Sequence, residues 1–428
     1  MLQMGVTPTI RSSNWVVAAS AILLALLGSP EILAQPVPRT VPLEEQVKKD
    51  MENSRFHLGA IRLFPTFSLA NAGYNNNLFG TRTQTVSDYT ATVSAGFRSL
   101  LPVGPKMYLR GEVSPAYYWY AHHVQQRSLG GRYAASWLGF FNWMSTDLSG
   151  GYSKSVNRLS SENESFVTQA FADGFSGLEV SLSRRWSLFA SGDAHRLRYS
   201  SDTAFLSRVR DLDRDDYGAR AGIRYRLTTF FDVAAEAEGT RTTFIRTSKQ
   251  RDNETRAYLV KVHYDRPRLF VDLTGGYRDG RPYNGSTFAP FATATGSYLL
   301  SYHLGVPVEV QAYGHRGPGY SLSNSNAYFI ETRNGLGLTL RIGYRLQLHG
   351  FGDFGTNKYS RPFPTAGTFV FRKDRATNVG GGLTANLFRN ASLLTLVTQT
   401  KLSSNVPGLG RSILRFSTNL SFEGTYPR

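Results

Sequence analysis

Charged side chains recur two or four positions apart in several stretches of this chain, and they are the residues best suited to chemistry. In the segment 217–227, Arg220, Arg224 and Arg226 alternate with apolar residues. A spacing of two places such side chains on one face of a β-strand. Guanidinium and carboxylate groups gathered on one face can bind or steer charged solutes without any covalent step. The candidates of this kind are Arg110, Glu112, Arg220, Arg224, Arg226, Asp272, Arg278, Arg341 and Arg345.

The sequence indicates neither covalent catalysis nor metal binding. It contains eight His but no Gly-x-Ser-x-Gly motif that would mark a serine nucleophile. His122 and His123 are adjacent, so in a strand they would point to opposite faces, which disfavours a shared metal. The absence of Cys excludes disulfides and zinc–thiolate sites. We therefore predict that the protein is not an enzyme and has no catalytic residues, no metal and no cofactor.

The elements that position these charges read as period-two strands from about residue 56 to the end. Leu336, Leu338 and Leu340 alternate with Gly337, Thr339 and Arg341, and segment 217–227 repeats this pattern. A soluble sandwich would bury the apolar face, whereas a membrane barrel would expose it to lipid. Arginine repeated on the opposite face, together with a secretion signal, favours the barrel. The charged candidates would then line its pore, although a register slip of one residue would invert the two faces.

The start of the chain predicts export. An uncharged run from Trp15 to Gly28 follows Arg11, and small residues precede a cleavage position after Ala34. The run is shorter than a spanning helix requires, so a signal anchor is the less favoured alternative. We expect a signal peptide at 1–34, a periplasmic lead-in segment at 35–55 and the barrel at 56–428. The lead-in could form a short helix over Leu43–Met51, but a disordered segment is favoured.

The spacing of turns predicts about eighteen antiparallel strands, with a range of 16–18, in an all-β, transmembrane, up-and-down β-barrel. Short turns, for example at 102–105 and 347–349, alternate with longer polar connections such as 157–165, 200–214 and 359–374. In outer-membrane barrels short turns face the periplasm and long loops face the exterior. The last strand, 414–423, alternates apolar and polar residues, which predicts assembly through the barrel-assembly machinery.

Charge composition limits the classes of partner. The chain has 48 Lys and Arg against 31 Asp and Glu, a formal net charge of +17. The basic residues recur singly within strands and at strand ends, so a nucleic-acid partner is not favoured. Inward arginines would make the lumen positive, or pair with inward acids. Outward arginines could instead meet anionic lipid headgroups.

The beginning of the predicted barrel carries a local motif. Pro65 lies in the first strand, followed by Tyr74, Asn76 and Asn77 in an Asn-rich loop and then by Ser87-Asp88. This pattern resembles the beta-barrel porin 2 family. The resemblance covers about thirty residues and implies an outer-membrane barrel, often encoded beside genes for exopolysaccharide synthesis. Asn76 stands where that family commonly has Asp. The resemblance carries over no catalytic residue.

Three functions remain open at this point. The leading one is a porin-like conduit in the outer membrane of a Gram-negative bacterium, for exopolysaccharide export or for diffusion of small anionic solutes. The alternative is a structural or docking barrel of an envelope export complex, with loops filling the lumen. A lipid-modifying barrel enzyme is less favoured. The expected partners are outer-membrane lipid, the barrel-assembly machinery and polysaccharide export components.

Overall fold

A computed structural model describes residues 43–81, 85–162, 166–200, 204–305, 307–323, 325–365, 368–388 and 390–423. The predicted signal peptide at 1–34 and the residues after 423 lie outside this described part. None of the described helices is long and apolar enough to cross a membrane.

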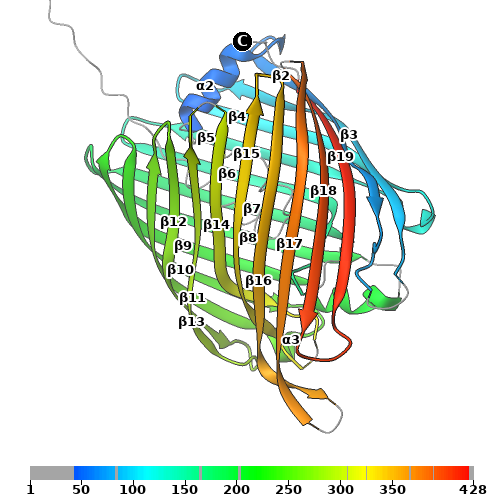
Figure 1. Ribbon diagram of the computed structural model, residues 1–428. Coiled ribbons are helices and arrows are strands. Elements are labelled where there is room, and N and C mark those ends of the chain that lie inside the picture. The colour runs from blue at the N-terminus through cyan, green and yellow to red at the C-terminus, as the bar shows by residue number, and fades with distance from the viewer. Residues whose placement is uncertain are drawn as a thin grey trace, which may run out of the picture.

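Eighteen antiparallel strands, β2 to β19, form one closed up-and-down barrel (Figure 1). Each strand pairs with its neighbours in sequence, and β19 pairs with β2 to close the sheet. The predicted fold class and strand number are therefore confirmed. The strands are β1 (Phe56–Leu58), β2 (Ile61–Asn75), β3 (Asp88–Pro102), β4 (Met107–Tyr120), β5 (Ser128–Phe140), β6 (Met144–Arg158), β7 (Phe166–Ser181), β8 (Trp186–Ser200), β9 (Arg214–Thr228), β10 (Phe231–Phe244), β11 (Asn253–Asp265), β12 (Leu269–Pro282), β13 (Phe291–His303), β14 (Val308–Tyr320), β15 (Tyr328–Ile342), β16 (Leu346–Thr365), β17 (Thr368–Phe388), β18 (Ala391–Ser404) and β19 (Arg411–Glu423).

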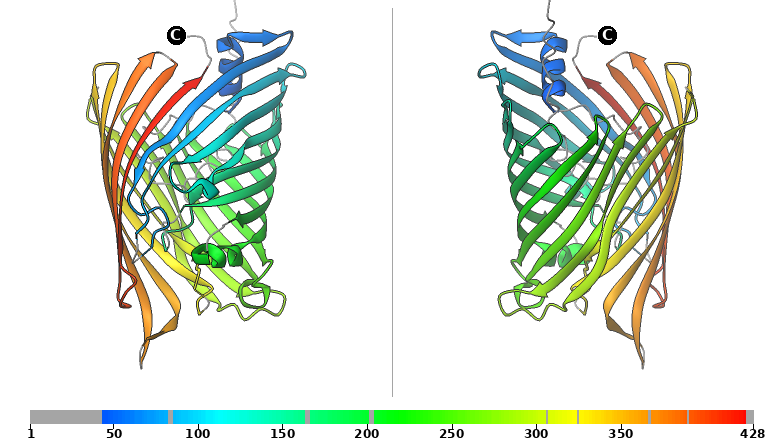
Figure 2. Two further views of the ribbon diagram at one scale, coloured as in Figure 1. Left: turned by 90° about the vertical axis from the view of Figure 1, so that its right-hand side faces the viewer. Right: turned by 90° about the vertical axis from the view of Figure 1, so that its left-hand side faces the viewer.

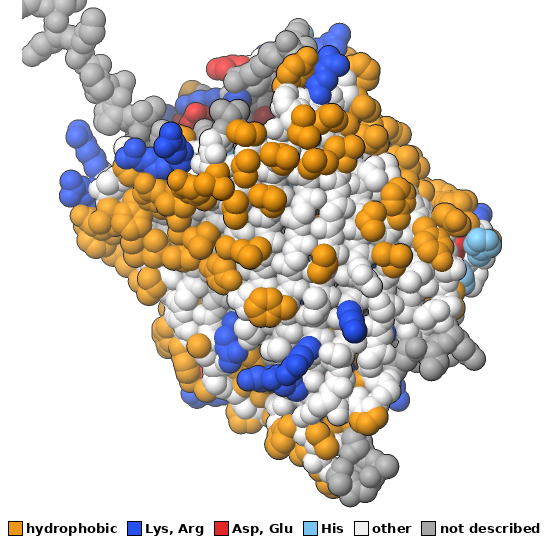
Figure 3. All heavy atoms as spheres, viewed as in Figure 1, with side chains coloured by type: hydrophobic (Ala, Val, Ile, Leu, Met, Phe, Trp, Pro, Cys, Tyr) orange, Lys and Arg blue, Asp and Glu red, His pale blue; other side chains and the backbone are white. Residues whose placement is uncertain are grey.

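The outer face of the barrel is apolar because the period-two pattern holds along the strands. On β15, Leu336, Leu338 and Leu340 are 63%, 50% and 37% exposed, although they are large hydrophobic residues. A water-soluble protein would bury such a row, whereas lipid covers it in an outer-membrane barrel. Figure 3 shows apolar side chains spread over the outer surface, most densely in the upper half of that view.

The two ends of the barrel differ. Short turns and the helix α2 (Leu43–Asn53) lie at one end, which we name the turn end (Figure 2). Longer connections lie at the other end, the loop end, together with three short helical segments. These are η2 (Val124–Gln126), η3 (Ala204–Leu212) and α3 (Ser248–Arg251).

Two sequence-based boundaries were wrong. The segment 359–374, predicted to be a loop, belongs mostly to β16 and β17, whose hairpin extends beyond the neighbouring strands at the loop end (Figure 1). The turn predicted at 347–349 lies instead at 343–345. The first error arises because polar and aromatic residues continue the alternation beyond the apolar band and resemble loop composition. The second arises because the alternation runs on through the turn to Leu346.

Closure between the first and last strands depends on close backbone contact. The pairing of β19 with β2 shifts register beside Asn71, which has a positive φ of 51°. A Cβ atom on Gly73 would collide with the carbonyl oxygen of Phe416, so only glycine fits there. Beyond the end of β2, the Asn76 side chain accepts a hydrogen bond of 2.8 Å from the backbone N–H of Leu414. Asn76 therefore extends this closing seam at the loop end.

Candidate functional site

The lumen is the candidate site, and strand β4 shows which residues face it. Leu109 and Val113 are 43% and 38% exposed on the outer surface. Because successive residues alternate between faces, Arg110 and Glu112 point into the barrel. The Glu112 carboxylate lies 3.2 Å from Arg132 of β5. Two of the predicted pore-lining residues thus lie on the inner face.

Strand β9 places three predicted arginines on the same inner face, and two of them pair with acids on neighbouring strands. Arg220 lies 3.3 Å from Asp193 of β8. Arg224 lies 2.6 Å from Glu179 of β7 and is only 3% exposed. Arg226 shares this face, two residues closer to the turn end. Pairing across strands holds these guanidinium groups against the wall.

Strand β12 carries two further candidates on its inner face. Arg278 donates hydrogen bonds of 3.0 and 3.1 Å to the two carboxylate oxygens of Glu238 on β10. Asp272 lies 3.8 Å from the His263 ring on β11. Both residues therefore belong to the polar lining of the lumen.

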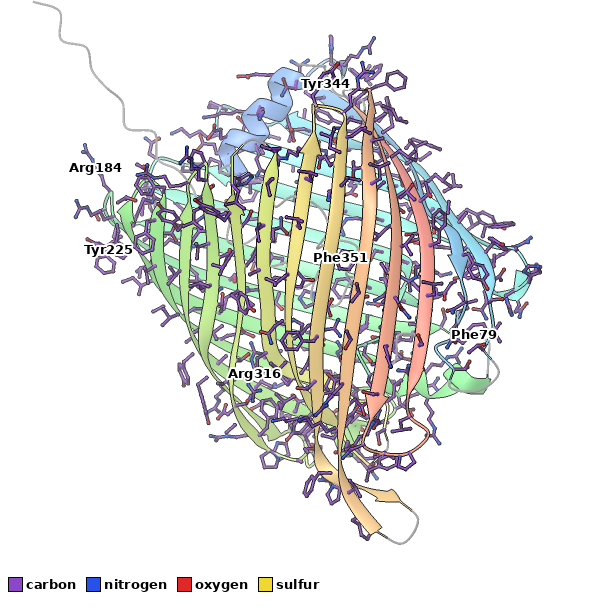
Figure 4. The ribbon with its side chains drawn as sticks, viewed as in Figure 1. Phe79, Arg184, Tyr225, Arg316, Tyr344 and Phe351 are labelled. Carbon is purple, nitrogen blue, oxygen red and sulfur yellow. The ribbon has the colours of Figure 1, made fainter. Side chains whose placement is uncertain are left out.

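The last two candidates differ in position. Arg341 of β15 lies 3.2 Å from Glu309 of β14, on the inner wall. Arg345, predicted to line the pore, lies instead in the exposed turn between β15 and β16. Its guanidinium group lies 5.3 Å from the ring centre of Tyr344. Figure 4 shows Tyr344 at the turn end, away from the lumen.

The lumen wall that these strands form is lined by ion pairs rather than by a continuous row of unpaired cations. Each inward arginine beside a carboxylate loses most of its long-range field, and salt screens the remainder over about 8 Å. Such a wall can orient polar and charged solutes without holding them tightly.

The connection between β6 and β7 crosses the lumen. Ser161 exchanges hydrogen bonds of 3.1 and 3.3 Å with Asn357 of β16, which is nine strands from β7 in either direction around the sheet. Next to it, the Glu162 carboxylate accepts hydrogen bonds from the Ser321 hydroxyl and the Leu322 backbone N–H, at 3.1 and 2.7 Å. This crossing loop therefore divides the lumen near the loop end.

A buried charge cluster holds the crossing loop to the opposite wall. Arg372 of β17 donates a hydrogen bond of 2.9 Å to Glu162 and another of 2.6 Å to Asp374. The Tyr359 hydroxyl donates a hydrogen bond of 2.9 Å to the same Asp374. The Arg411 side chain also donates to the Glu162 backbone carbonyl. Burial strengthens these contacts because little water competes for them.

Further loop-end connections fold inward and pack against the inner wall. Leu78 and Phe79 come from the β2–β3 connection, and Val209 and Leu212 come from η3. They form one apolar cluster with inward residues of β4, β7, β8 and β10. Its wall members are Ala116, Tyr118, Tyr120, Val167, Leu197, Tyr199 and Phe244. The passage at this end is therefore narrower than the bare barrel.

Helix α2 occupies the turn-end mouth (Figure 2). Val47 is 4% exposed and packs against an apolar patch of the inner wall. Asp50 lies 3.1 Å from Arg98, which also lies 2.6 Å from Glu423 near the end of the barrel. The pKa of the Asp50 carboxyl is raised overall, because the effect of burial exceeds the opposing effect of the nearby Arg98. The patch consists of Phe64, Leu100, Tyr108, Leu138 and Phe140. The sequence favoured a disordered lead-in. The segment forms a helix instead because its apolar side packs against this patch.

The motif residues of the first strand and loop have structural contacts. Pro65 lies within β2, and the Tyr74 ring lies 5.2 Å from the Tyr89 ring. Asn77 is 1% exposed and exchanges hydrogen bonds of 2.8 and 2.9 Å with the Thr81 backbone. These contacts shape the first loop, and the motif lies at the seam rather than along the ion-paired wall.

Adjacent histidines at the loop end bind a carboxylate. The ring Nδ1 atoms of His122 and His123 lie 3.1 and 2.7 Å from the Asp88 carboxylate, which also accepts their backbone N–H groups. Asp88 therefore fixes the start of the β4–β5 connection. No group of three or more metal-binding side chains occurs among the described residues.

Sequence reasoning missed the cluster around the crossing loop. Glu162 lay in a polar connection without a recognisable motif, and Arg372 and Asp374 lay in a segment predicted to be a loop. The alternation that continues from Asp374 through Ala376 to Asn378 was the available signal for an inward face. The contact between Glu162 and Arg372 spans 210 residues, so no local pattern reveals it.

Comparisons with known proteins define the class. No family model matches the chain, and no curated protein matches it in sequence. Among solved structures it is similar to OccK2 (OpdF) from Pseudomonas aeruginosa in complex with glucuronate, with 11% identity, a TM-score of 0.53, and coverage of 86% of this chain and 99% of that one. It is also similar to a BenF-like porin from Pseudomonas fluorescens Pf-5, with 10% identity, a TM-score of 0.52, and coverage of 86% and 99%.

A third similar structure is OccAB3 from Acinetobacter baumannii, with 10% identity, a TM-score of 0.50, and coverage of 86% of this chain and 100% of that one. Identity this low shows the fold alone. The protein has the fold of outer-membrane porins. Together with its apolar outer face, this fold makes it a β-barrel of the bacterial outer membrane.

Proposed function

We propose that the protein is a passive, non-enzymatic conduit for small polar solutes across the outer membrane, with a weak preference for anions. The observation that carries this proposal is the lumen wall of inward arginines and carboxylates, narrowed by a crossing loop held at Glu162. Polar walls let hydrated solutes pass, and a constriction limits their size. The basic excess of the chain, +17, favours anions over cations.

A carboxylated sugar is the solute class to test first. OccK2, which shares the fold, was solved in complex with glucuronate. In this chain, arginines such as Arg220 could exchange their paired carboxylate for that of a passing solute. Export of an exopolysaccharide, implied by the resemblance to the beta-barrel porin 2 family, is less well supported because the crossing loop obstructs a polymer.

The second candidate is a structural or docking barrel of an envelope export complex. Helix α2 at the turn end and the inward loops at the loop end favour it, since they narrow the passage at both mouths. As part of the proposal, β19 is recognised by the barrel-assembly machinery, and the loop end faces the exterior.

Planar bilayer recordings test the conduit. The wild-type protein should give discrete conductance steps and a reversal potential that indicates weak anion preference. Replacing Arg220, Arg224 and Arg226 by Gln leaves Asp193 and Glu179 without their arginines, so selectivity should shift towards cations. The control changes three outward cations instead, Arg241, Arg256 and Arg281, and should leave selectivity unchanged.

The outcomes separate the two candidates. Correctly inserted protein without any conductance step would support the docking barrel and contradict the conduit. Strong cation selectivity in the wild-type protein would contradict the anion preference. If the triple variant does not fold, Arg220→Gln alone should give a smaller shift in the same direction.

A further inference from the structure

Four cations lie together on the outer face of the barrel near its loop end. They are exposed residues on three adjacent strands, and we name them the outer basic patch: Lys358 of β16, Lys373 and Arg375 of β17, and Lys401 of β18. The alternation of each strand puts them on the same face as the exposed, lipid-facing Phe354, Val379 and Val397. These side chains therefore point away from the lumen.

Strand register places the four cations side by side. Lys358 is directly opposite Lys373, and Arg375 is opposite Thr356, two residues from Lys358. Lys401 is opposite Thr377, two residues from Arg375. Side chains directly opposite each other have Cβ atoms about 5 Å apart, and like charges at that spacing destabilise a sheet. An anion lying over the patch would remove this repulsion.

No acid neutralises the patch from within the chain. Along the described parts of β15 to β19, the outward positions carry no Asp or Glu, because Glu331, Asp353, Asp374 and Glu423 all lie on the inward side of the alternation. None of the four cations forms an ion pair with a described residue.

The opposite arrangement occurs on β10 to β12, at the same end of the barrel. There the outward Arg241 lies 2.8 Å from Glu254, and the outward Arg281 lies 3.1 Å from Asp279. These two outward cations are thus paired with acids of the chain itself. The difference marks the patch on β16 to β18 as a place where negative charge must come from outside the protein.

The patch lies at the height of a lipid headgroup. On β17 the outward residues from Thr377 to Leu387 lie between Arg375 and the turn end, and they cover ten residue steps. At about 3.3 Å per residue and a strand tilt of about 40°, this distance corresponds to an apolar band about 25 Å tall. Arg375 and Lys373 follow immediately beyond this band. Figure 3 shows Lys and Arg side chains on the loop-end half of this face as well as along the turn-end rim, and Figure 4 shows Arg316 in the loop-end half.

We propose that the outer basic patch binds the phosphate groups of lipopolysaccharide in the outer leaflet. The ligand must be amphipathic, because the cations adjoin exposed apolar residues such as Phe354 and Val379 on the membrane side. Phosphorylated glucosamine headgroups carry several negative charges close together, and four adjacent cations suit them better than a single-charge lipid. Acyl chains would lie along the apolar residues below the patch.

Native mass spectrometry of the full chain in detergent tests this site. Bisphosphorylated lipid A should bind at least about tenfold more tightly than dephosphorylated lipid A, as expected for several interfacial cations. The variant with Lys373→Gln, Arg375→Gln and Lys401→Gln should lose about that factor for the bisphosphorylated form. The matched control, with Arg241→Gln, Arg256→Gln and Arg281→Gln, should bind lipid A like the wild type.

Each alternative result contradicts the proposal. Equal binding of the two lipid forms would exclude phosphate recognition, and equal loss in both triple variants would exclude this location. Competition by inorganic phosphate at the concentration of the lipid would indicate a free-phosphate site instead. The comparison of the two lipids on the wild-type protein needs no variant, so a folding failure does not affect it. The conductance of the patch variant should not change, which separates this test from that of the conduit.

Discussion

At the scale of single residues, the same side chain has two roles in this barrel, decided by the face on which it lies. Inward Arg224 is buried against Glu179, whereas outward Arg375 is exposed and forms no ion pair with a described residue. The period of two makes this difference depend on residue parity alone. An arginine therefore places a positive charge on the strand, and its position in the alternation decides whether that charge faces the lumen or the outer surface.

Gly73 gives a residue-scale prediction for the closing seam. Gly73→Ala would force a methyl group against the Phe416 carbonyl, and overpacking of this kind costs about 1–3 kcal/mol or more. Samples of the variant heated at a series of temperatures before SDS gel electrophoresis should lose the folded band at a clearly lower temperature than the wild type. Gly174→Ala is the control, because a Cβ there meets no atom within 4 Å, and its transition should match that of the wild type. Equal transitions for both variants would show that the seam tolerates a side chain.

At the scale of elements, the crossing loop gives the second prediction. Glu162→Ala removes the carboxylate that joins the loop to Arg372, and a buried group that loses a partner costs about 1–3 kcal/mol. The loop should leave the opposite wall more often, so single-channel conductance should rise and its noise should increase. Glu254→Ala, which breaks only an outward ion pair, should leave the conductance unchanged. A conductance of Glu162→Ala equal to that of the wild type would mean that the loop does not limit the passage.

Helix α2 gives the third prediction. Val47→Asp places a charge in the apolar contact with the inner wall, so the helix should leave the mouth and become cleavable by trypsin after Lys48 or Lys49. Asp50→Asn should leave the helix docked. Because burial raises the pKa of Asp50 in the docked state, docking is favoured at low pH and weakens as pH rises through that pKa, and the Asn variant should lose this dependence. Cleavage sites are identified by mass spectrometry, and equal protection of Val47→Asp and the wild type would refute the docking contact.

The sequence predicted the repeated elements better than the contacts between them. Alternation along segments such as 336–342 is local, so strand number and barrel class followed from it. The crossing loop and helix α2 are held by side chains far apart in sequence, as the contact of Glu162 with Arg372 shows. Arg345 was misplaced for a different reason, because the alternation runs on through the turn that Gly343 begins with a positive φ of 64°.

At the scale of the whole molecule, charge and apolar surface are arranged along the barrel axis. Large apolar residues form the outer band, the outer basic patch follows it at the loop end, and helix α2 lies in the opposite mouth. This order matches a membrane whose two surfaces differ. Exposed cations occur at both ends, but the outer basic patch at the loop end lacks acids on its own face and suits a leaflet rich in phosphate, which on this proposal places the turn end in the periplasm.

This axial order leads to a prediction about orientation in the cell. The chain contains no Cys, so single cysteines report their own positions without background. Val124 lies in η2 at the loop end and is 57% exposed, whereas Tyr344 lies in a turn at the other end and is 83% exposed. A membrane-impermeant maleimide added to intact cells should label Val124→Cys and should label Tyr344→Cys only after the outer membrane is opened. The reverse pattern would place the turn end outside, and it would also remove the outer basic patch from the lipopolysaccharide leaflet.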